Sequence, residues 1–442
     1  GYNVANSCRF NDGDNPSLKK TPSGAGSLTN WTFSCWVKRS TISNAQQMIA
    51  MAKASSGNDT QINFSSGDQI EFFNRSGGSV NGMLLTNRVF RDVSSWYHIV
   101  AVWNSDDGTA GNRMRLYING TEETSFATDT NPSADTESKF NSACEHVIGQ
   151  ATTGSADFDG YLAEVVYIDG QALTPTSFGE FDEDSPTIWK PKDVSGLTFG
   201  TNGFYLDFED SSNLGNDIAG NGDWTETNLA ATDQSTDTCT NNFATLNPLY
   251  NQYVDPTYSE GNLKITSGSG WSGAKGTMGV SKGKWFWELK LTGTMSSHQH
   301  GVQQENVNES AQNPQNTTGS TSFYNHDGGE MNTDGSNTSA DYGTFSSGEI
   351  MGLALDMDAG SYGQITIYKN GSAIVSNFNL SSSSTTVMPH LSIDNSTVEC
   401  NFGSPPYSES GGNSDGNGYG NFSMSVPSGH FCLNTKNLAE YG

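Results

Sequence analysis

Residues 207–223 carry the side chains best suited to holding a metal ion. This stretch, DFEDSSNLGNDIAGNGD, places carboxylates and amides at short spacing: Asp207, Glu209, Asp210, Asn213, Asn216, Asp217 and Asp223. Ca²⁺ takes about six to eight oxygen ligands, which such side chains and nearby carbonyls supply. Asx and Gly residues also make tight turns without any metal, and the spacing of an EF-hand loop is missing. The stretch therefore predicts either a Ca²⁺ site or a set of turns.

A second candidate metal site is the pair His298 and His300, which flank Gln299. Side chains alternate along a strand, so both imidazoles would share one face if this stretch is a strand. Strands related by a trimer axis would then bring several imidazoles around one transition metal. Exposed histidines in a polar loop are the alternative.

Aromatic residues within polar loops are candidates for contact with sugars. Trp271, Tyr324 and Tyr342 lie in or beside Gly-, Ser- and Asn-rich stretches. A flat ring can stack on the face of a sugar while nearby amides bond its hydroxyls, and loops on a rigid scaffold commonly carry binding functions. Most other aromatic residues, including Trp285 and Trp287, alternate along strands and are expected to pack in a core.

Two patterns raise the question of catalysis. Residues 279–283, GVSKG, match the nucleophile elbow G-x-S-x-G, but that motif needs a helix after its serine and a tryptophan-rich strand follows here. Glycoside hydrolysis needs two carboxylates flanking the scissile bond. Glu180, Asp182 and Asp184 in GEFDEDSP come nearest, but Pro186 ends that stretch. We expect a protein that is not an enzyme.

Composition narrows the classes of partner. The 442 residues carry a net charge of −27, and the pI is near 4.4, which disfavours binding to nucleic acid or to anionic membranes. No apolar run approaches the ~20 residues that a membrane span needs. The six cysteines show no Cys-x-x-Cys spacing, so we expect most thiols to be free, with Cys35 and Cys400 in the core.

Hydrophobic patterning indicates an all-β protein. Short segments with two-residue alternation recur between Gly, Asn, Asp and Ser clusters, and helical periodicity is almost missing. The predicted parts are a β-sandwich over residues 1–185, an acidic connector over 186–248 that docks through Phe204, Leu206 and Phe208, a second β-sandwich over 249–408, and a flexible Gly/Ser-rich exit segment over 409–442. One helical turn is expected within residues 173–181, because Thr174 is followed by Pro175.

Two similar hairpins raise the question of duplication. Residues 114–123, MRLYINGTEE, resemble residues 365–374, ITIYKNGSAI. Asn-Gly favours a two-residue type I′ turn, in which both residues have positive φ. Because the flanking sequences differ, we interpret these as equivalent local solutions in two unrelated sandwiches rather than as a copied domain.

The first 185 residues resemble the laminin G-like, concanavalin A-like jelly rolls. The resemblance rests on FSCWVKRS (33–40), SSWYHIVAVWNS (94–105), RLYINGTEE (115–123) and FDGYLAEVVYIDGQALTPTSF (158–178). Relatives often hold Ca²⁺ at a loop rim. Residues 250–407 look like a SPRY domain, through GVSKGKWFWELKL (279–291), GEIMGLALDMDAG (348–360), ITIYKNG (365–371) and NFGSPP (401–406). SPRY domains bind partners through variable loops.

The combination of these two domains with the connector resembles virion structural proteins of marine bacteriophages, in tail fibres or head-decorating fibres. That resemblance implies a virion-surface protein assembled in the host cytoplasm, a homotrimer as the usual fibre state, and contacts with other virion proteins and a host-surface glycan. A purely structural virion spacer, a polysaccharide depolymerase and a bacterial surface adhesin are the alternatives. The spacer would bury residues 301–348 against neighbouring subunits, whereas an adhesin would expose them.

Overall fold

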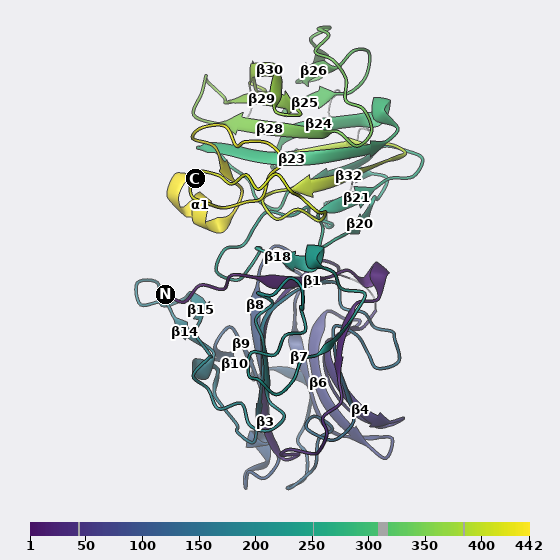
Figure 1. The fold of residues 1–442 in the computed structure, drawn as a ribbon, viewed down its shortest axis with the longest axis vertical. Helices are drawn as coiled ribbons and strands as arrows, with labels where there is room; N and C mark the ends of the chain where they lie inside the picture. The colour runs from purple at the N-terminus through teal and green to yellow at the C-terminus, as the bar shows by residue number, and fades with distance from the viewer. Residues whose placement is uncertain (43–44, 251, 308–316, 383–384) are drawn as a thin grey trace. The chain divides into compact units, whose positions relative to one another are not determined.

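The computed structural model describes residues 1–42, 45–250, 252–307, 317–382 and 385–442. The chain divides into two compact units, Gly1–Thr240 and Asn241–Gly442. Within these described residues each unit is a sandwich of β-sheets (Figure 1), which confirms the prediction of an all-β protein with two sandwiches.

One sheet of the first unit has the strand order β10-β9-β8-β3-β13-β1-β18, and β16 also pairs with β13. Its strands are β1 (Ser7–Phe10), β3 (Asn30–Arg39), β8 (Tyr97–Asn104), β9 (Met114–Ile118), β10 (Thr121–Glu122), β13 (Gly160–Asp169), β16 (Phe204–Leu206) and β18 (Gln234–Ser235). We call this the connector-side sheet, because residues after position 186 supply two of the strands named above.

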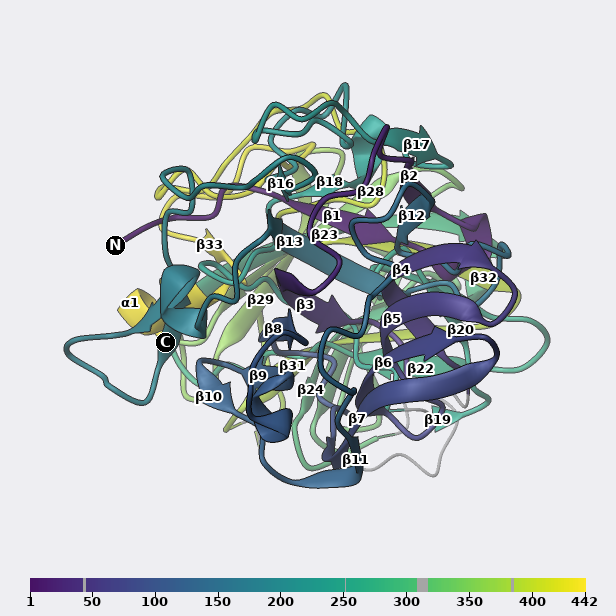
Figure 2. The same cartoon turned by 90° about the horizontal axis from the view of Figure 1, so that it is seen from below.

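The opposite sheet of the first unit has the order β11-β7-β6-β5-β4-β12-β2-β17. Its strands are β2 (Ser17–Lys20), β4 (Gln47–Ser55), β5 (Asn58–Phe64), β6 (Gln69–Ser76), β7 (Ser79–Val89), β11 (Phe126–Thr130), β12 (Glu145–Ile148) and β17 (Thr225–Thr227). Figure 2 shows β4 to β7 side by side as a curved layer. β14 (Gly179–Phe181) pairs separately with β15 (Trp189–Pro191).

Short 3₁₀ turns interrupt the loops of the first unit. They are η1 (Asp12–Asp14), η2 (Ala110–Asn112), η3 (Pro175–Ser177) and η4 (Ala231–Asp233). η3 begins after Thr174 with Pro175 as its first residue, which confirms the helical turn predicted in this segment.

Aromatic packing between the sheets forms the core of the first unit. Trp31 and Trp103 are fully buried and stack with ring centroids 6.4 Å apart, and Phe72 contacts Trp31 from the opposite sheet at 5.7 Å. The Trp31 indole N–H donates to the Ser138 hydroxyl at 2.7 Å, so its polar atom is satisfied inside the core.

Residues 186–240 of the predicted connector belong to the first unit, and residues 241–248 belong to the second. Phe204, Leu206 and Phe208 are buried in the core between the sheets, which confirms their predicted apolar face. Tyr205 points to the other side and packs with Val166 on the outer face of β13. Segments of this stretch therefore serve as sheet strands and as a cover for the outer face.

The second unit consists of two sheets within the described residues. One has the order β19-β22-β31-β24-β25-β26-β27, and the other β20-β21-β32-β23-β28-β29-β30, with β33 pairing β23 in parallel. The first contains β19 (Gln252–Tyr253), β22 (Ser272–Lys275), β24 (His298–Gln304), β25 (Ser320–Tyr324), β26 (Glu330–Thr333), β27 (Ser336–Asn337) and β31 (Val387–Ile393). The second contains β20 (Thr257–Ser259), β21 (Lys264–Thr266), β23 (Lys284–Gly293), β28 (Ile350–Asp356), β29 (Gln364–Lys369), β30 (Ser372–Asn379), β32 (Ser396–Asn401) and β33 (Phe431–Cys432).

The C-terminal residues pack on the second sandwich instead of forming a flexible exit. Phe286 lies on the face of β23 opposite Trp285 and Trp287, so it needs its own cover. Phe422 supplies that cover, with ring centroids 5.2 Å apart. The chain then forms α1 (Thr435–Tyr441), in which the Asn434 side chain caps the N-terminus by accepting from the Asn437 N–H. The Gly- and Ser-rich composition of residues 409–442 had predicted a flexible segment, because it did not indicate that Phe422 and the residues of α1 pack on the sandwich.

All six cysteines lie in the described part of the chain and are unpaired. Cys35 and Cys400 are fully buried in the two cores, as predicted. Among the described residues, none forms a helix long and apolar enough to cross a membrane.

Both Asn-Gly hairpins have positive φ at both turn residues. The values are 48° and 77° at Asn119 and Gly120, and 47° and 84° at Asn370 and Gly371. Their surroundings differ. A Cβ added at Gly120 would lie 2.3 Å from the Trp189 ring, whereas nothing lies within 4 Å of one added at Gly371.

Replacing the turn glycines therefore gives a matched pair of predictions. Gly371→Ala places a Cβ at positive φ in open space, which should lower the free energy of unfolding by about 1 to 2 kcal/mol. Gly120→Ala adds the clash with Trp189, so we expect a loss of about 3 kcal/mol or more. Denaturant unfolding of the full chain measures both, and equal losses would contradict the Trp189 contact.

Candidate functional site

Connections between the two sheets of the second unit gather at one end of its sandwich. Residues 267–271 join β21 to β22, residues 294–297 join β23 to β24, and residues 394–395 join β31 to β32. Backbone bonds hold these connections together: Asn395 N–H donates to the Gly268 carbonyl at 2.9 Å, and Asp394 N–H donates to the Ser297 carbonyl at 3.2 Å. The Asp394 carboxylate also accepts from the Gly270 N–H at 2.7 Å. We call this the crossing-loop end.

Two of the three aromatic residues predicted to contact sugars meet at this end. Trp271 directly precedes β22, and Tyr324 is the last residue of β25. The pairing of β22, β31, β24 and β25 brings the ends of these strands together. Ser272 pairs with Ile393, Ile393 with His298, and Gln299 with Tyr324. The rings of Trp271 and Tyr324 lie edge to face with centroids 6.0 Å apart, and both side chains are half-buried.

His326 extends the aromatic pair. Its ring stacks on Tyr324 with centroids 5.1 Å apart and planes inclined by 13°. Half-buried rings that hold one another in place lose little conformational freedom when a ligand stacks on them. Sequence reasoning missed His326, although its position two residues after Tyr324 could have been noticed.

Tyr342 takes a different place. Its backbone N–H donates to the Gly329 carbonyl at 2.9 Å, and its ring packs against the core of the second unit. It therefore helps to hold the loop that follows β25, and its ring does not join the Trp271–Tyr324 pair.

An open depression lined by small polar residues lies at the crossing-loop end. It contains about 500 Å³ of space that is continuous with solvent. Its lining residues are Thr266, Ser267, Thr292, Gly293, Asn395, Ser396 and Thr397. Ser267 and Asn395 belong to or border the connections described above. Hydroxyls and amides in an open depression suit a hydroxyl-rich ligand.

The predicted Ca²⁺ ligands are used in turns of the first unit. Asp207 accepts from the Glu209 N–H, and Asp210 accepts from the Ser212 N–H and hydroxyl. Asp217 accepts from the backbone N–H groups of Tyr205 and Ala219. These carboxylate oxygens therefore accept hydrogen bonds from nearby backbone N–H groups. Such bonds are typical of the turns that were the alternative to a Ca²⁺ site.

The remaining predicted ligands also bond within the segment. Asp223 accepts from the Asp217 N–H and the Asn213 amide, and Lys20 pairs with Asp217 at 3.5 Å. Asn216 donates its N–H to the Asn213 carbonyl. Among the described residues, no group of three or more His, Cys, Asp or Glu side chains could hold a metal ion. The predicted Ca²⁺ ligand set is therefore not assembled.

His298 and His300 share a strand face, but that face is the inside of the sandwich. The His298 Nδ1 and His300 Nε2 atoms lie 3.0 Å apart, and both residues are fully buried. Burial lowers the pKa of His298 to about 4 and that of His300 well below its usual value. The two residues do share a strand face, so they are not the exposed loop histidines of the alternative. The hypothesis of imidazoles gathered around a metal on a trimer axis is corrected, because both side chains are buried inside one chain and are neutral at pH 7.

A buried carboxyl group in each unit escaped sequence reasoning. Glu164 lies at a bulge in β13 with φ of 49°, and it accepts from the hydroxyls of Tyr205 at 2.9 Å and Tyr2 at 3.3 Å. Burial raises its pKa to about 7. Glu288 on β23 accepts from the N–H groups of Ser423 and Met424, and burial raises its pKa to about 7. The sequence signal that could have indicated these buried carboxyl groups is a glutamate within an otherwise apolar strand.

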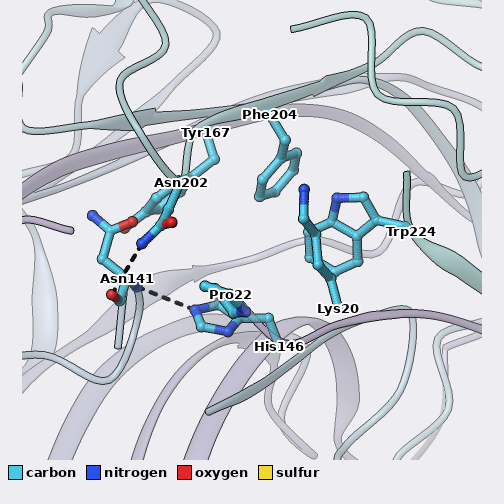
Figure 3. Close-up of a pocket in the computed structure, with 8 residues that line it drawn as sticks. All are labelled: Lys20, Pro22, Asn141, His146, Tyr167, Asn202, Phe204 and Trp224. Carbon is cyan, nitrogen blue, oxygen red and sulfur yellow. Dashed lines mark hydrogen bonds between the residues drawn. The ribbon is translucent and has the colours of Figure 1, made fainter. Parts of the chain in front are cut away.

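A narrow pocket in the first unit is lined by aromatic and amide side chains (Figure 3). In the figure, Tyr167 and Asn141 lie on one side of the central space, with Phe204, Trp224 and Lys20 on the others and His146 below. The Asn141 Oδ1, Tyr167 hydroxyl and Trp224 indole N–H are buried without a hydrogen-bond partner within the described chain. The pocket has room for little more than a water molecule, which could bond these atoms.

The fold and these sites together define an all-β protein with two sandwiches. Residues 12–177 match the family Laminin_G_3, the concanavalin A-like lectin/glucanases superfamily, and residues 284–405 match the SPRY domain family. The chain therefore carries a laminin G-like domain in its first unit and a SPRY domain in its second. No curated protein matches the sequence.

Solved structures that resemble the chain cover parts of it. The SPRY domain of human HERC1 is 18% identical, with a TM-score of 0.30, over 35% of this chain and 96% of that chain. A protein from Bacteroides ovatus to which carbohydrate binding is ascribed is 16% identical, with a TM-score of 0.34, over 51% of this chain and 59% of its own. A SAP-like pentraxin from Limulus polyphemus is 20% identical, with a TM-score of 0.28, over 39% and 80%.

The raised pKa of Glu164 predicts a pH-dependent stability. Between the usual glutamate pKa of 4.5 and the folded value of about 7, the folded state holds a proton that the unfolded chain has released. This group's contribution is therefore fully present below about pH 4.5 and is lost as the pH rises through 7. The parent chain should lose roughly 2 to 3 kcal/mol of unfolding free energy between pH 5 and 8 relative to Glu164→Gln.

Denaturant unfolding at several pH values measures this difference. Glu145→Gln, on an exposed position of β12, is the matched control and should keep the pH dependence of the parent chain. If Glu164→Gln and the parent chain lose stability equally over this range, Glu164 does not carry the proton.

Proposed function

We propose that this protein is a virion appendage protein, in a tail fibre or a head fibre, that attaches to a glycan on the host surface through the crossing-loop end of its second unit. The observation that carries the proposal is the half-buried Trp271–Tyr324 pair, extended by the His326 ring that stacks on Tyr324. The virion role rests on the resemblance of the domain combination to phage structural proteins.

The chemistry of the site favours a neutral, hydroxyl-rich ligand. Ring faces suit the C–H faces of sugars, whereas Ser, Thr and Asn side chains suit their hydroxyls. The net charge of −27 disfavours strongly anionic glycans, because like charges repel at long range. The match of the first unit to a superfamily that includes lectins agrees with a glycan as ligand, although it concerns the other unit.

Affinity in this proposal comes from repetition. An open site with two or three rings and a few hydrogen bonds binds a sugar weakly, and a fibre that carries several copies raises the effective concentration of each site. We propose a homotrimer on the virion, held by contacts with other virion proteins.

We propose binding without catalysis. Ser281 of the GVSKG stretch is followed by strand β23 rather than by a helix. Asp182 accepts from the backbone N–H groups of Asp184 and Ser185 and pairs with Lys190, so it acts as a turn residue near the surface. Incubation with bacterial polysaccharides should release no oligosaccharides.

The glycan proposal predicts loss of binding on removal of one ring. On a glycan array, Trp271→Ala should reduce binding by about tenfold or more, because a stacked ring contributes on the order of 1 to 2 kcal/mol. Tyr362→Ala removes an exposed aromatic residue of the same unit that lies outside the site, and should bind like the parent chain. Chelator should leave binding unchanged, because no group of three or more metal-ligating side chains is found among the described residues.

Binding that survives Trp271→Ala unchanged would contradict the site. Binding that chelator abolishes would instead support a Ca²⁺-dependent lectin. If the array shows no glycan at all, a purely structural virion spacer becomes the better interpretation.

The virion proposal has its own test. Antibodies against this chain should label intact particles at regularly repeated positions in negative-stain electron microscopy. Particles of a phage lacking the gene are the control. Labelling of bacterial cells without phage would point to a bacterial surface adhesin and would overturn the virion role.

A further inference from the structure

A second pocket with binding chemistry lies on the outer face of the connector-side sheet in the first unit. It has about 370 Å³ of space, continuous with solvent at its mouth, which is enough for one sugar ring. β8, β9, the loop between them and residues 172–174 supply its lining: Val102, Asn104, Asp107, Asn112, Arg115, Tyr117, Ala172, Leu173 and Thr174. We call it the Arg115 pocket.

Apolar side chains form one part of the Arg115 pocket. Val102 and Tyr117 are buried in the small hydrophobic cluster on the outer face of the sheet, and Leu173 packs against that cluster. These residues are held in place by the covering segment, so they offer a fixed apolar surface. Such a surface suits the C–H face of a sugar ring.

Polar side chains form the other part and are already oriented. The Arg115 guanidinium donates to the Asn112 amide oxygen and to the Tyr117 hydroxyl, at 3.4 Å for the latter. The Asn112 amide donates to the Asp107 carboxylate at 3.3 Å, and the Thr109 N–H donates to the same carboxylate at 2.7 Å. This chain of bonds positions a fork of donors beside acceptors before any ligand arrives.

Arg115 keeps donors for a ligand. Its side chain is 34% exposed, whereas its Nε atom is buried and lies 3.6 Å from Glu122 Oε1, so the donors left for a ligand are on the two terminal nitrogens. A guanidinium offers five N–H donors, and two of them are used in the bonds described above.

The charges around the Arg115 pocket favour a neutral ligand. One cation, Arg115, faces the carboxylates of Asp107 and Glu122, so no net positive charge remains to attract an acid. Paired hydroxyls of a sugar can accept from the guanidinium and amides, and can donate to a carboxylate or amide oxygen. We propose that the Arg115 pocket binds a neutral hexopyranose residue, independently of the crossing-loop end.

Saturation-transfer NMR and calorimetric titration of the full chain with glucose, galactose and mannose test this proposal. At least one of these hexoses should bind in the millimolar range, and glucuronate should bind more weakly. Ala172→Trp, an exposed residue at the rim, should fill the pocket and weaken binding by about tenfold or more. Ala134→Trp, exposed outside the pocket, is the matched control and should bind normally.

A second variant tests the hydrogen-bond donors of Arg115 without filling the pocket. Arg115→Lys keeps the charge but loses the planar set of donors, so hexose binding should fall by about tenfold with an unchanged unfolding midpoint. Trp271→Ala should leave this binding intact, which distinguishes the two sites. The proposal is overturned if no hexose binds, if glucuronate binds more tightly, or if Trp271→Ala abolishes binding while Ala172→Trp does not.

Discussion

Each sandwich depends on covering a central strand that is apolar on both faces. In the first unit, Val165 of β13 faces the core whereas Val166 faces outward, and in the second unit Trp285 and Phe286 of β23 divide in the same way. A strand of an antiparallel sheet usually has one face toward solvent. Leaving the outer face bare would expose residues whose burial contributes about 1.5 to 3 kcal/mol each.

The chain meets this constraint with segments that composition alone marks as linkers. Residues after position 186 cover the outer face of β13, and residues around Phe422 and Met424 cover that of β23. The same arrangement explains the buried carboxyl groups. Glu164 and Glu288 lie on the covered faces, and tyrosine hydroxyls or backbone N–H groups satisfy them there. A polar group in such a place is tolerated only when it is bonded.

The candidate binding regions arise where this covering ends. The Arg115 pocket is bounded by residues 172–174, where the chain begins to cross the outer face of the connector-side sheet. The Trp271–Tyr324 pair lies where connections pass between the sheets of the second unit and no segment covers the rings completely. Both regions combine a rigid strand on one side with a loop on the other, which suits weak and selective binding of small polar ligands.

Local sequence patterns were sufficient to predict most strands and turns, but not the residues that pack around them. Alternation predicted β3, β8, β13, β23 and β28, and Asn-Gly predicted both type I′ turns, because strand pattern and turn geometry depend on a few adjacent residues. The strands β25 and β26 lie within residues 301–348, which were expected to be loops because most of their residues are polar. The stretch around His298 and His300, now β24, was left open between a strand and a loop. Residues 308–316 of that predicted loop lie outside the described residues.

Amino-acid sequence by itself therefore determined the all-β class, the strand cores and the three aromatic residues worth examining. Tertiary structure alone decided that Trp271 and Tyr324 meet while Tyr342 does not, because strand register sets those distances. It also decided that His298 and His300 face the core, and that Asp217 and Asp223 accept hydrogen bonds from nearby backbone N–H groups. The physical reason is that a side chain's chemistry is local, whereas the partner that uses its hydrogen bonds is brought to it by the fold.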